Sequence, residues 1–228
     1  MKYFTKQYLN FFKTLAANNH KQWFDENRKT YETVVREPFK VFIGDLIQAI
    51  GEIEPEISTL EPKNAIFRIN RDIRFSKDKT PYKLFNSAII AVNGRKDKSY
   101  PGLYLELNPE KLRILGGVYK PSTLEVKKIR TYMENNEKEF KKIISDSKFV
   151  TTFGAIKGNK HKRLPKEFVT AAEKQTLIWN KQWYYETALS PKIILKDDLL
   201  ETIVKHYKIA NDVQNFFIKA LFDNSVQF

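Results

Sequence analysis

The sequence of 228 residues predicts an α+β fold, in which an antiparallel β-sheet is flanked by helices from both the N- and C-terminal parts of the chain. Three observations predict it. Apolar residues recur at helical spacing over the first fifty residues, and they do so again from about residue 197 onward. Between these regions, residues 102–119 alternate apolar and polar side chains around a turn, as a β-hairpin does. The length fits one domain, which we expect to cover residues 1–228.

Three helices are expected in the N-terminal part. Thr5 is suited to cap the first, and Pro38 suits the first turn of the third. Gly51 and Pro55 are expected to end that third helix. The apolar stripes are, in chain order, Leu9, Phe12, Leu15 and Ala16; Trp23, Phe24, Tyr31, Val34 and Val35; and Phe39, Phe42, Ile43, Leu46, Ile47 and Ile50.

The pattern becomes strand-like from about Ile66. Residues 67–69 (FRI) and 86–92 (NSAIIAV) have β-rich compositions. Residues 103–107 alternate strictly, and Asn108 with Pro109 begins a reverse turn that leads into a partner strand at 112–119. Since these strands are joined locally, we expect an antiparallel sheet.

Helices return after residue 121. Ser122 or Thr123 is suited to cap a helix whose buried face holds Val126, Ile129 and Met133. A second helical segment follows with Phe140, Ile143 and Ile144. Asp197 or Asp198 is expected to cap a long C-terminal helix. Its apolar stripe is Leu200, Ile203, Val204, Tyr207, Ala210, Val213, Phe217 and Leu221.

Composition limits the function classes. The absence of cysteine excludes disulfides, thiolate catalysis and cysteine-based metal sites, and the three scattered histidines show no metal-ligand spacing. We therefore predict neither a metal site nor a cofactor. No apolar run is long enough to span a membrane and the N-terminus resembles no secretory signal, so a soluble, cytoplasmic protein without a membrane partner is expected. The net charge of +13 favours anionic partners, although a generally lysine-rich composition also accounts for it.

One basic segment combines many cations with core residues. Residues 65–83 read AIFRINRDIRFSKDKTPYK. If residues 66–74 are extended, successive side chains point to opposite faces, and one face then carries Arg68, Asn70, Asp72 and Arg74. Guanidinium groups suit planar anions such as phosphate and carboxylate. We therefore predict an anion site in an Arg/Lys-rich cleft, with the basic contacts Arg68, Arg71, Arg74, Lys77, Lys79 and Lys83.

Two other interpretations of this segment stay open. The arginines could instead form an internal network of ion pairs with Asp72 and Asp78. An enzyme acting on a phosphorylated or carboxylated metabolite would need an acid or base here, for which Asp72, Asp78 and Tyr82 are the weak catalytic candidates.

The same segment carries a family resemblance. The pattern FRI-x-RD-x-RFSKDKTPYK resembles the signature of a broad family of bacterial and fungal proteins known as domain of unknown function 2461. Further similar stretches are NNHKQWFDENRKTY at 18–31, YPGLYLEL at 100–107, GGVYKPSTLEVKKIR at 116–130 and FGAIKGNKHKRLPKEF at 153–168. The resemblance covers most of residues 5–168 and thins beyond Phe168, so that 169–228 reads as a C-terminal helical completion. It implies a conserved hypothetical protein and supplies no activity.

The resemblance also marks further positions. Trp23, Arg28 and Tyr31 lie in one family motif, and Gly116, Gly117 and Tyr119 lie in another. We hypothesise that these two motifs and the basic segment converge on one cleft, where Trp23, Arg28 and Tyr119 join the ligand contacts. Alternatively, the aromatic residues belong to the core and the glycines serve a bulge or a turn.

A second basic stretch lies later in the chain. Residues 157–166 carry five Lys or Arg side chains without an intervening acid, which is compatible with phosphate tracking along nucleic acid. No recognition helix or nucleic-acid motif accompanies it, so nucleic acid is the less favoured partner. The expected partner is an anionic small molecule, and the sequence predicts no oligomeric state.

Overall fold

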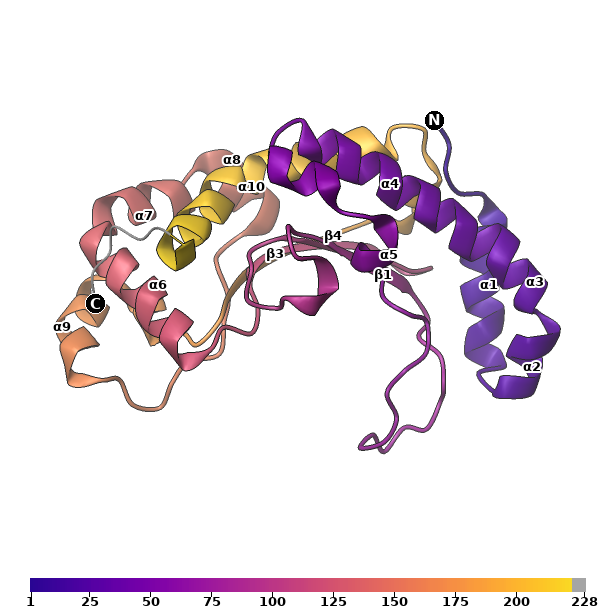
Figure 1. The fold of residues 1–228 in the computed structure, drawn as a ribbon, viewed down its shortest axis with the longest axis horizontal. Coiled ribbons are helices and arrows are strands. Elements are labelled where there is room, and N and C mark those ends of the chain that lie inside the picture. Colours follow the sequence, from indigo (N-terminus) through magenta and orange to yellow (C-terminus); the bar gives the residue numbers. More distant parts are fainter. Residues whose placement is uncertain (223–228) are drawn as a thin grey trace. The chain divides into compact units, whose positions relative to one another are not determined.

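The α+β prediction is confirmed by the computed structural model, which describes residues 1–222 (Figure 1). The sheet is antiparallel, with four strands in the order β1-β2-β3-β4. The strands are β1 (Asn86–Ile90), β2 (Leu103–Leu107), β3 (Leu112–Val118) and β4 (Trp183–Leu189). Because each strand lies beside its neighbour in sequence order, every connection returns the chain to the adjacent position in the sheet.

Helices precede and follow the first three strands. The N-terminal ones are α1 (Lys6–Ala17), α2 (Lys21–Glu26), α3 (Arg28–Thr30), α4 (Glu37–Gly51) and α5 (Pro62–Ala65). The later ones are α6 (Thr123–Asn135), α7 (Glu137–Ile144), α8 (Ser147–Phe153), α9 (Val169–Lys174) and α10 (Leu199–Phe222). A π-helical segment covers Tyr31–Arg36, and 3₁₀ turns cover Pro55–Thr59, Gly94–Lys96, Lys166–Phe168, Thr176–Trp179 and Pro191–Leu195. No helix within residues 1–222 is long and apolar enough to cross a membrane.

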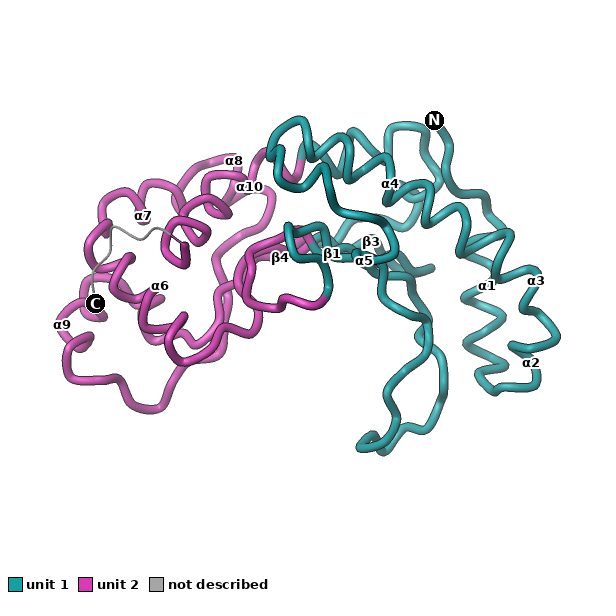
Figure 2. The backbone as a smooth tube through the Cα atoms, viewed as in Figure 1, with its two compact units in different colours: residues 1–95, 104–114, 188–205 teal, residues 96–103, 115–187, 206–228 magenta. Residues whose placement is uncertain are grey.

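The chain divides into two compact units, each built from separate segments (Figure 2). Unit 1 contains residues 1–95, 104–114 and 188–205, and unit 2 contains residues 96–103, 115–187 and 206–228. In unit 1, α4 packs against β1 and α5, over an aromatic core that includes Phe4, Phe39 and Phe42. In unit 2, the rings of Trp183 and Phe140 both pack against Phe217.

Local signals in the sequence explain several element boundaries. The Thr5 side chain accepts a hydrogen bond from the backbone N–H of Gln7, which confirms it as the cap of α1. Ser122 and Glu125 form a reciprocal capping box at the start of α6. The expected end of α4 at Gly51 is also observed.

Two sequence predictions need correction. Residues 67–69 form no strand; only isolated bridges join Ile66 to Ala88 and Asn70 to Tyr82. The two bridges differ in register, since three residues separate Ile66 from Asn70 whereas five separate Tyr82 from Ala88, and this mismatch prevents a continuous ladder. The second predicted helix is also interrupted, since α2, α3 and the π-helical segment follow one another over residues 21–36.

Candidate functional site

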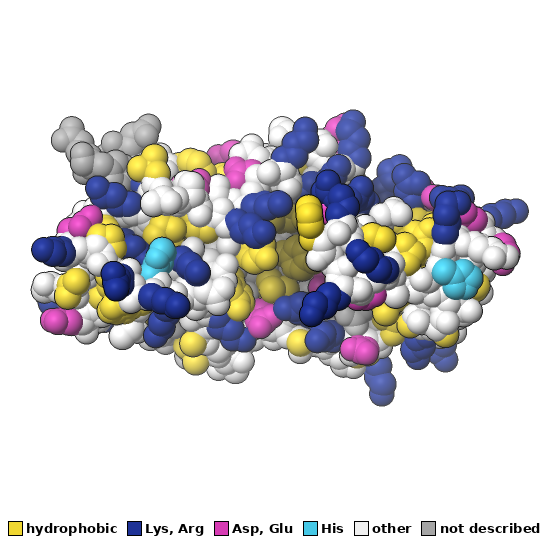
Figure 3. Space-filling view, turned by 90° about the horizontal axis from the view of Figure 1, so that it is seen from below, with side chains coloured by type: hydrophobic (Ala, Val, Ile, Leu, Met, Phe, Trp, Pro, Cys, Tyr) yellow, Lys and Arg dark blue, Asp and Glu magenta, His cyan; other side chains and the backbone are white. Residues whose placement is uncertain are grey.

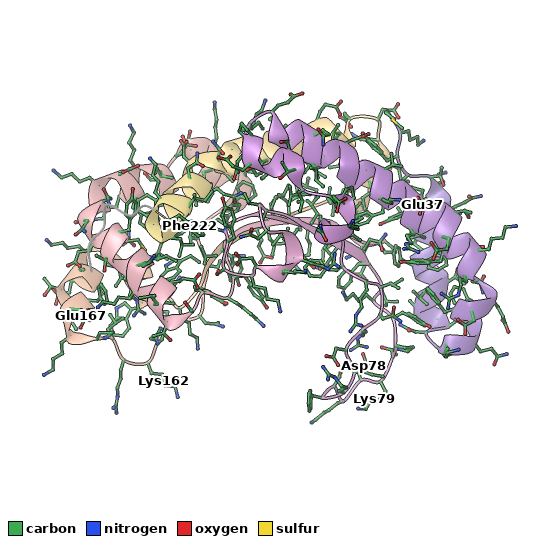
Figure 4. The ribbon with its side chains drawn as sticks, viewed as in Figure 1. Glu37, Asp78, Lys79, Lys162, Glu167 and Phe222 are labelled. Atoms are coloured by element: carbon green, nitrogen blue, oxygen red, sulfur yellow. The ribbon has the colours of Figure 1, made fainter. Side chains whose placement is uncertain are left out.

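The predicted basic site lies on an extended loop that we call the arm, residues 66–85 of unit 1. The backbone N–H of Phe67 donates to Ser87 O over 3.0 Å, and that of Lys83 donates to Ile69 O over 2.8 Å. Figure 4 shows the arm extending away from β1, with Asp78 and Lys79 at its far end. The two halves of the arm therefore run side by side as a narrow ribbon, held by few backbone hydrogen bonds.

The predicted alternation of side chains along the arm is confirmed. Ile69 is buried and Arg71 is half-buried, whereas Arg68, Asn70 and Asp72 between and beside them are exposed. An extended backbone places successive side chains on opposite faces, which accounts for this pattern.

Two of the predicted arginines are engaged with carboxylates of the arm itself. Arg74 donates through Nε and Nη2 to both oxygens of Asp72, over 2.9 and 2.8 Å. Arg71 donates through Nη1 to Asp78 Oδ2 over 2.6 Å, and also to the side chain and carbonyl of Thr80. Figure 3 shows how widely Lys and Arg side chains are spread over one face of the molecule, so these two pairs account for only a few of them.

These contacts lower the pKa values of the two acidic side chains of the arm. Hydrogen bonds from the side chain and backbone of Arg74 lower the pKa of Asp72 to about 2. Hydrogen bonds from Thr80 and Arg71 lower the pKa of Asp78 to about 2 as well. Both carboxylates are therefore ionised at neutral pH and act as hydrogen-bond acceptors that shape the arm.

The remaining cations of the arm differ in their surroundings. Lys79 donates to Ile73 O over 3.0 Å, and Lys83 donates to Arg68 O over 2.9 Å. Burial, and to a lesser extent the charge of Arg68, lowers the pKa of Lys83. The side chains of Arg68 and Lys77 form no hydrogen bond or ion pair with any residue in the described part of the chain.

The family motif at residues 18–31 contacts the arm at Tyr82. The ring of Phe24 stacks on the buried ring of Tyr82 at 4.0 Å between centroids, and Asn19 exchanges two hydrogen bonds with the Tyr82 backbone. Trp23 and Tyr31 both pack against Phe11. Phe24 and Asn19 thus fasten the arm to α2 and to the residues that precede it, whereas Trp23 and Tyr31 pack against the helical core.

Arg28 has its own local contacts. Its guanidinium pairs with Asp25 over 2.5 Å and lies over the ring of Phe24 at 5.5 Å from the centroid.

The family motif that contains Gly116, Gly117 and Tyr119 lies in unit 2. There the backbone of Gly116 comes close to the side chain of Tyr185. A Cβ on Gly116 would lie 2.2 Å from the hydroxyl oxygen of Tyr185, and Gly117 has a φ of 105°. Gly116 thus allows a close approach that a Cβ would block, and Gly117 adopts a positive φ that favours glycine. The nearby ring of Tyr119 is largely exposed, with Lys120 Nζ at 5.4 Å from its centroid.

A pocket of about 770 Å³ lies in unit 2 between α6 and the loop that follows α8; we call it the α6 pocket. Figure 4 marks Lys162 and Glu167 on that loop. The basic side chains lining the pocket are Lys127, Arg130, His161, Arg163 and Lys181, and Glu167 is the acidic one. Leu124, Pro165 and Phe168 supply apolar wall. The pocket therefore combines a surplus of positive charge with apolar surface.

Arg130 is the buried cation of this pocket. Only 3% of the residue is exposed. Its Nε donates to Ile178 O over 2.8 Å, its Nη2 donates to Asn180 O over 3.1 Å, and its Cζ lies 5.7 Å from the centroid of Phe168. A guanidinium has five N–H groups, so these two hydrogen bonds leave donors to spare. Within residues 1–222, no carboxylate forms an ion pair with Arg130.

Burial and neighbouring charges shift the pKa values of two groups in the α6 pocket. Burial lowers the pKa of Arg130, and the charge of Glu167 offsets this in part. Burial lowers the pKa of His161 below 6.5, and the charges of Arg130 and Lys181 lower it further. These effects favour the neutral form of His161 beside the cations of the pocket.

The second basic stretch forms one wall of this pocket and is attached to β4. Lys157 pairs with Glu186 over 3.0 Å, and bridges join Lys157 to Tyr184 and Lys160 to Asn180. Lys162 and Lys166 remain exposed.

Comparison with known proteins identifies the family. Residues 7–216 match the family described as "Conserved hypothetical protein (DUF2461)". The chain belongs to the DUF2461 family. A search of curated proteins finds no match. The DUF2461 match includes residues of both units and extends past the region where the resemblance was expected to thin.

The DUF2461 motifs contain a residue that is not among the predicted site residues. Arg130 is the last residue of the motif at 116–130, and its burial could have been predicted. A helix turns by about 100° per residue, so Arg130 lies only about 40° around the helix from Val126, on the same face. An arginine on a buried helical stripe is a signal for a compensated buried charge. His161 and Lys181 carry no comparable signal, because the fold brings them to α6 from distant parts of the chain.

Proposed function

We propose that this protein binds a small anionic ligand, bearing a phosphate or carboxylate group, in the α6 pocket. The observation that carries the proposal is the buried guanidinium of Arg130, which lines the pocket without a carboxylate partner in the described chain. A buried charge is costly unless it is paired, by several kcal/mol for an isolated ion. An anion in the pocket would supply the missing charge and accept the unused N–H groups of Arg130.

Other groups around the pocket favour the same ligand. Lys127 and Arg163 are exposed cations on opposite walls, where they can approach an anion without the cost of burial. Thr123 lies in the first turn of α6, where the partial positive charge of a helix N-terminus favours an anion.

The apolar wall refines the ligand class. Phe168 is buried and Leu124 is largely exposed, and both line the pocket. A ligand with an apolar or aromatic part next to its anionic group would contact both kinds of surface.

The arm is the less suitable place for such a ligand. Arg71 and Arg74 already pair with Asp78 and Asp72, so an added anion would have to compete with those carboxylates. The proposed function therefore keeps the predicted ligand class and moves its site to the α6 pocket.

Thermal unfolding tests the proposal. Sulfate and phosphate should raise Tm more than chloride does at equal ionic strength. A ligand at ten times its Kd stabilises the folded state by about 1.4 kcal/mol, which corresponds to about 3–6 °C for a chain of this size. The variant Lys127→Ala with Lys181→Ala should lose most of the anion-specific increase.

A matched control removes charge elsewhere in unit 2. Lys138 lies exposed on α7 and is absent from the pocket lining, so Lys138→Ala should keep the sulfate effect. The proposal fails if sulfate and chloride stabilise the wild-type protein equally. It also fails if the double variant responds to sulfate as the wild type does.

A further inference from the structure

The arm ends in a single exposed aromatic ring. Phe75 is 96% exposed, and the guanidinium carbon of Arg74 lies 5.8 Å from the centroid of its ring. A fully exposed phenylalanine at the end of a projecting ribbon buries nothing within unit 1. Its contribution to folding is therefore negligible, and the ring is free to be buried by a partner.

The ring is presented by a tip with defined side-chain contacts. Asp72 accepts from the backbone and side chain of Arg74, and Asp78 accepts from the backbone N–H of Thr80 over 2.9 Å. Lys79 reaches across the tip to the carbonyl of Ile73. The two acids of the arm thus hold its end in shape, which lowers the ordering cost of inserting Phe75 into a partner.

The charge of the arm complements a polyanion. Residues 66–85 carry six basic and two acidic side chains, a net charge of +4. Arg68 and Lys77 are exposed and form no ion pair with any residue among 1–222. Both are therefore available for phosphate contacts without breaking an internal pair.

From the exposed ring of Phe75, the projecting shape of the arm and its net charge of +4, we propose that the arm binds double-stranded DNA. The basic side chains contact phosphates, and Phe75 enters the minor groove as a wedge between base pairs. Apolar wedges of this kind partly unstack a base step and bend the duplex. The arm is long enough: Phe75 lies five positions beyond Asn70 of the Asn70–Tyr82 bridge, a span of up to about 16 Å, whereas the minor groove is about 7.5 Å deep.

A DNA duplex fits these features better than a lipid surface does. Membrane binding by an exposed tip scales with the apolar area that it buries. At the end of the arm only Phe75 is a fully exposed apolar side chain, since Ile73 is half-buried and Asp72 and Asp78 carry negative charge. One ring suffices for a wedge between base pairs. The proposal concerns unit 1 and is independent of the α6 pocket.

The test measures binding and bending with the full chain. A duplex of about two helical turns carries a donor and an acceptor dye at its ends, and affinity is read by fluorescence anisotropy at several salt concentrations. The wild-type protein should bind and bring the dyes closer together. Phe75→Ala should weaken binding at least about fivefold and abolish the change in dye distance, since a stacked ring is worth about 1–3 kcal/mol per base.

A charge variant separates the phosphate contacts from the wedge. Arg68→Ala with Lys77→Ala, which leaves the tip contact of Lys79 in place, should lower the slope of log affinity against log salt by about 2, since each phosphate contact contributes about 0.9. The matched control Lys13→Ala with Lys29→Ala removes two exposed lysines from α1 and α3, and it should leave the slope unchanged.

Three results would each overturn the proposal. The first is absence of duplex binding by the wild-type protein. The second is equal affinity and equal bending for the wild type and Phe75→Ala. The third is tighter binding to anionic lipid vesicles, or to single-stranded DNA of the same length, than to the duplex.

Discussion

At the scale of single residues, the charge of Arg130 is the feature that most needs an explanation. Two backbone carbonyls accept hydrogen bonds from its guanidinium, yet they carry only partial charges and neutralise nothing. The ring of Phe168 adds a weak cation–π attraction. The charge of Glu167 acts on Arg130 without an ion pair, and the proposed anionic ligand would supply a direct partner.

The first prediction follows from replacing this arginine. Arg130→Met should abolish stabilisation by sulfate, because the variant lacks the guanidinium group that would bind the anion. Without sulfate, the unfolding free energy should change little, since the loss of the donor to the carbonyls of Ile178 and Asn180 opposes the removal of a buried, unpaired charge. Urea unfolding with and without sulfate measures both effects. Equal sulfate stabilisation of the variant and the wild type would contradict the role of Arg130.

The second prediction concerns Gly116. Gly116→Ala should lower the free energy of unfolding by about 1–3 kcal/mol, because its Cβ would overlap the buried hydroxyl of Tyr185, which is held by Gln214 over 2.7 Å. Gly154→Ala is the comparison, since a Cβ there meets nothing within 4 Å and only its φ of 72° is unfavourable. The packing explanation would be wrong if Gly154→Ala destabilised the protein more than Gly116→Ala.

At the scale of elements, short-range signals predicted much of the fold. The β2–β3 hairpin follows from the alternation at 103–107 and the Asn108 turn, whose side chain accepts from the backbone of Glu110 and Lys111. The start of α6 follows from Ser122. In contrast, β4 was not predicted, because residues 183–189 mix aromatic and polar side chains without a clear period.

The arm and the α6 pocket mark the limits of such signals. The alternation along the arm was predicted correctly, whereas the sequence left open whether its arginines form an anion site or the observed ion pairs of Arg71 with Asp78 and Arg74 with Asp72. The α6 pocket depends on tertiary contacts, because Lys181 joins α6 only through the packing of residues 157–184. Local sequence patterns carry no information about such tertiary contacts.

The third prediction is the pH dependence of anion binding, which belongs to α6 and the facing loop. In the free pocket, burial and the charges of Arg130 and Lys181 hold the pKa of His161 below 6.5. A bound anion favours protonated His161 and raises that pKa, so affinity should increase as the pH falls through the raised value. Calorimetric titration of sulfate between pH 5 and 8 measures this, and sulfate keeps its own charge over that range.

The control for this titration is His161→Gln, which keeps a polar side chain without a titrating ring. Sulfate affinity of this variant should change much less with pH. If it varied with pH as steeply as the wild type, His161 would not be the group responsible.

At the scale of the whole molecule, the two units share elements of secondary structure. The chain passes between them within β2 after residue 103, within β3 after residue 114, within β4 after residue 187 and within α10 after residue 205. Unfolding one unit would break three strands and a helix that continue into the other. The fourth prediction is therefore a single cooperative transition, with calorimetric and van't Hoff enthalpies that agree. Two separate transitions would show that the units fold independently.

The central claim is that the α6 pocket binds an anion through Arg130. Anomalous diffraction from crystals of the full chain soaked in selenate tests it most directly, because selenate has the shape and charge of sulfate and a strong anomalous signal. We expect an anomalous peak within hydrogen-bonding distance of the Arg130 guanidinium, and its absence from crystals of Arg130→Met. Anomalous peaks only elsewhere, such as beside Arg68 and Lys77 of the arm, would contradict the claim.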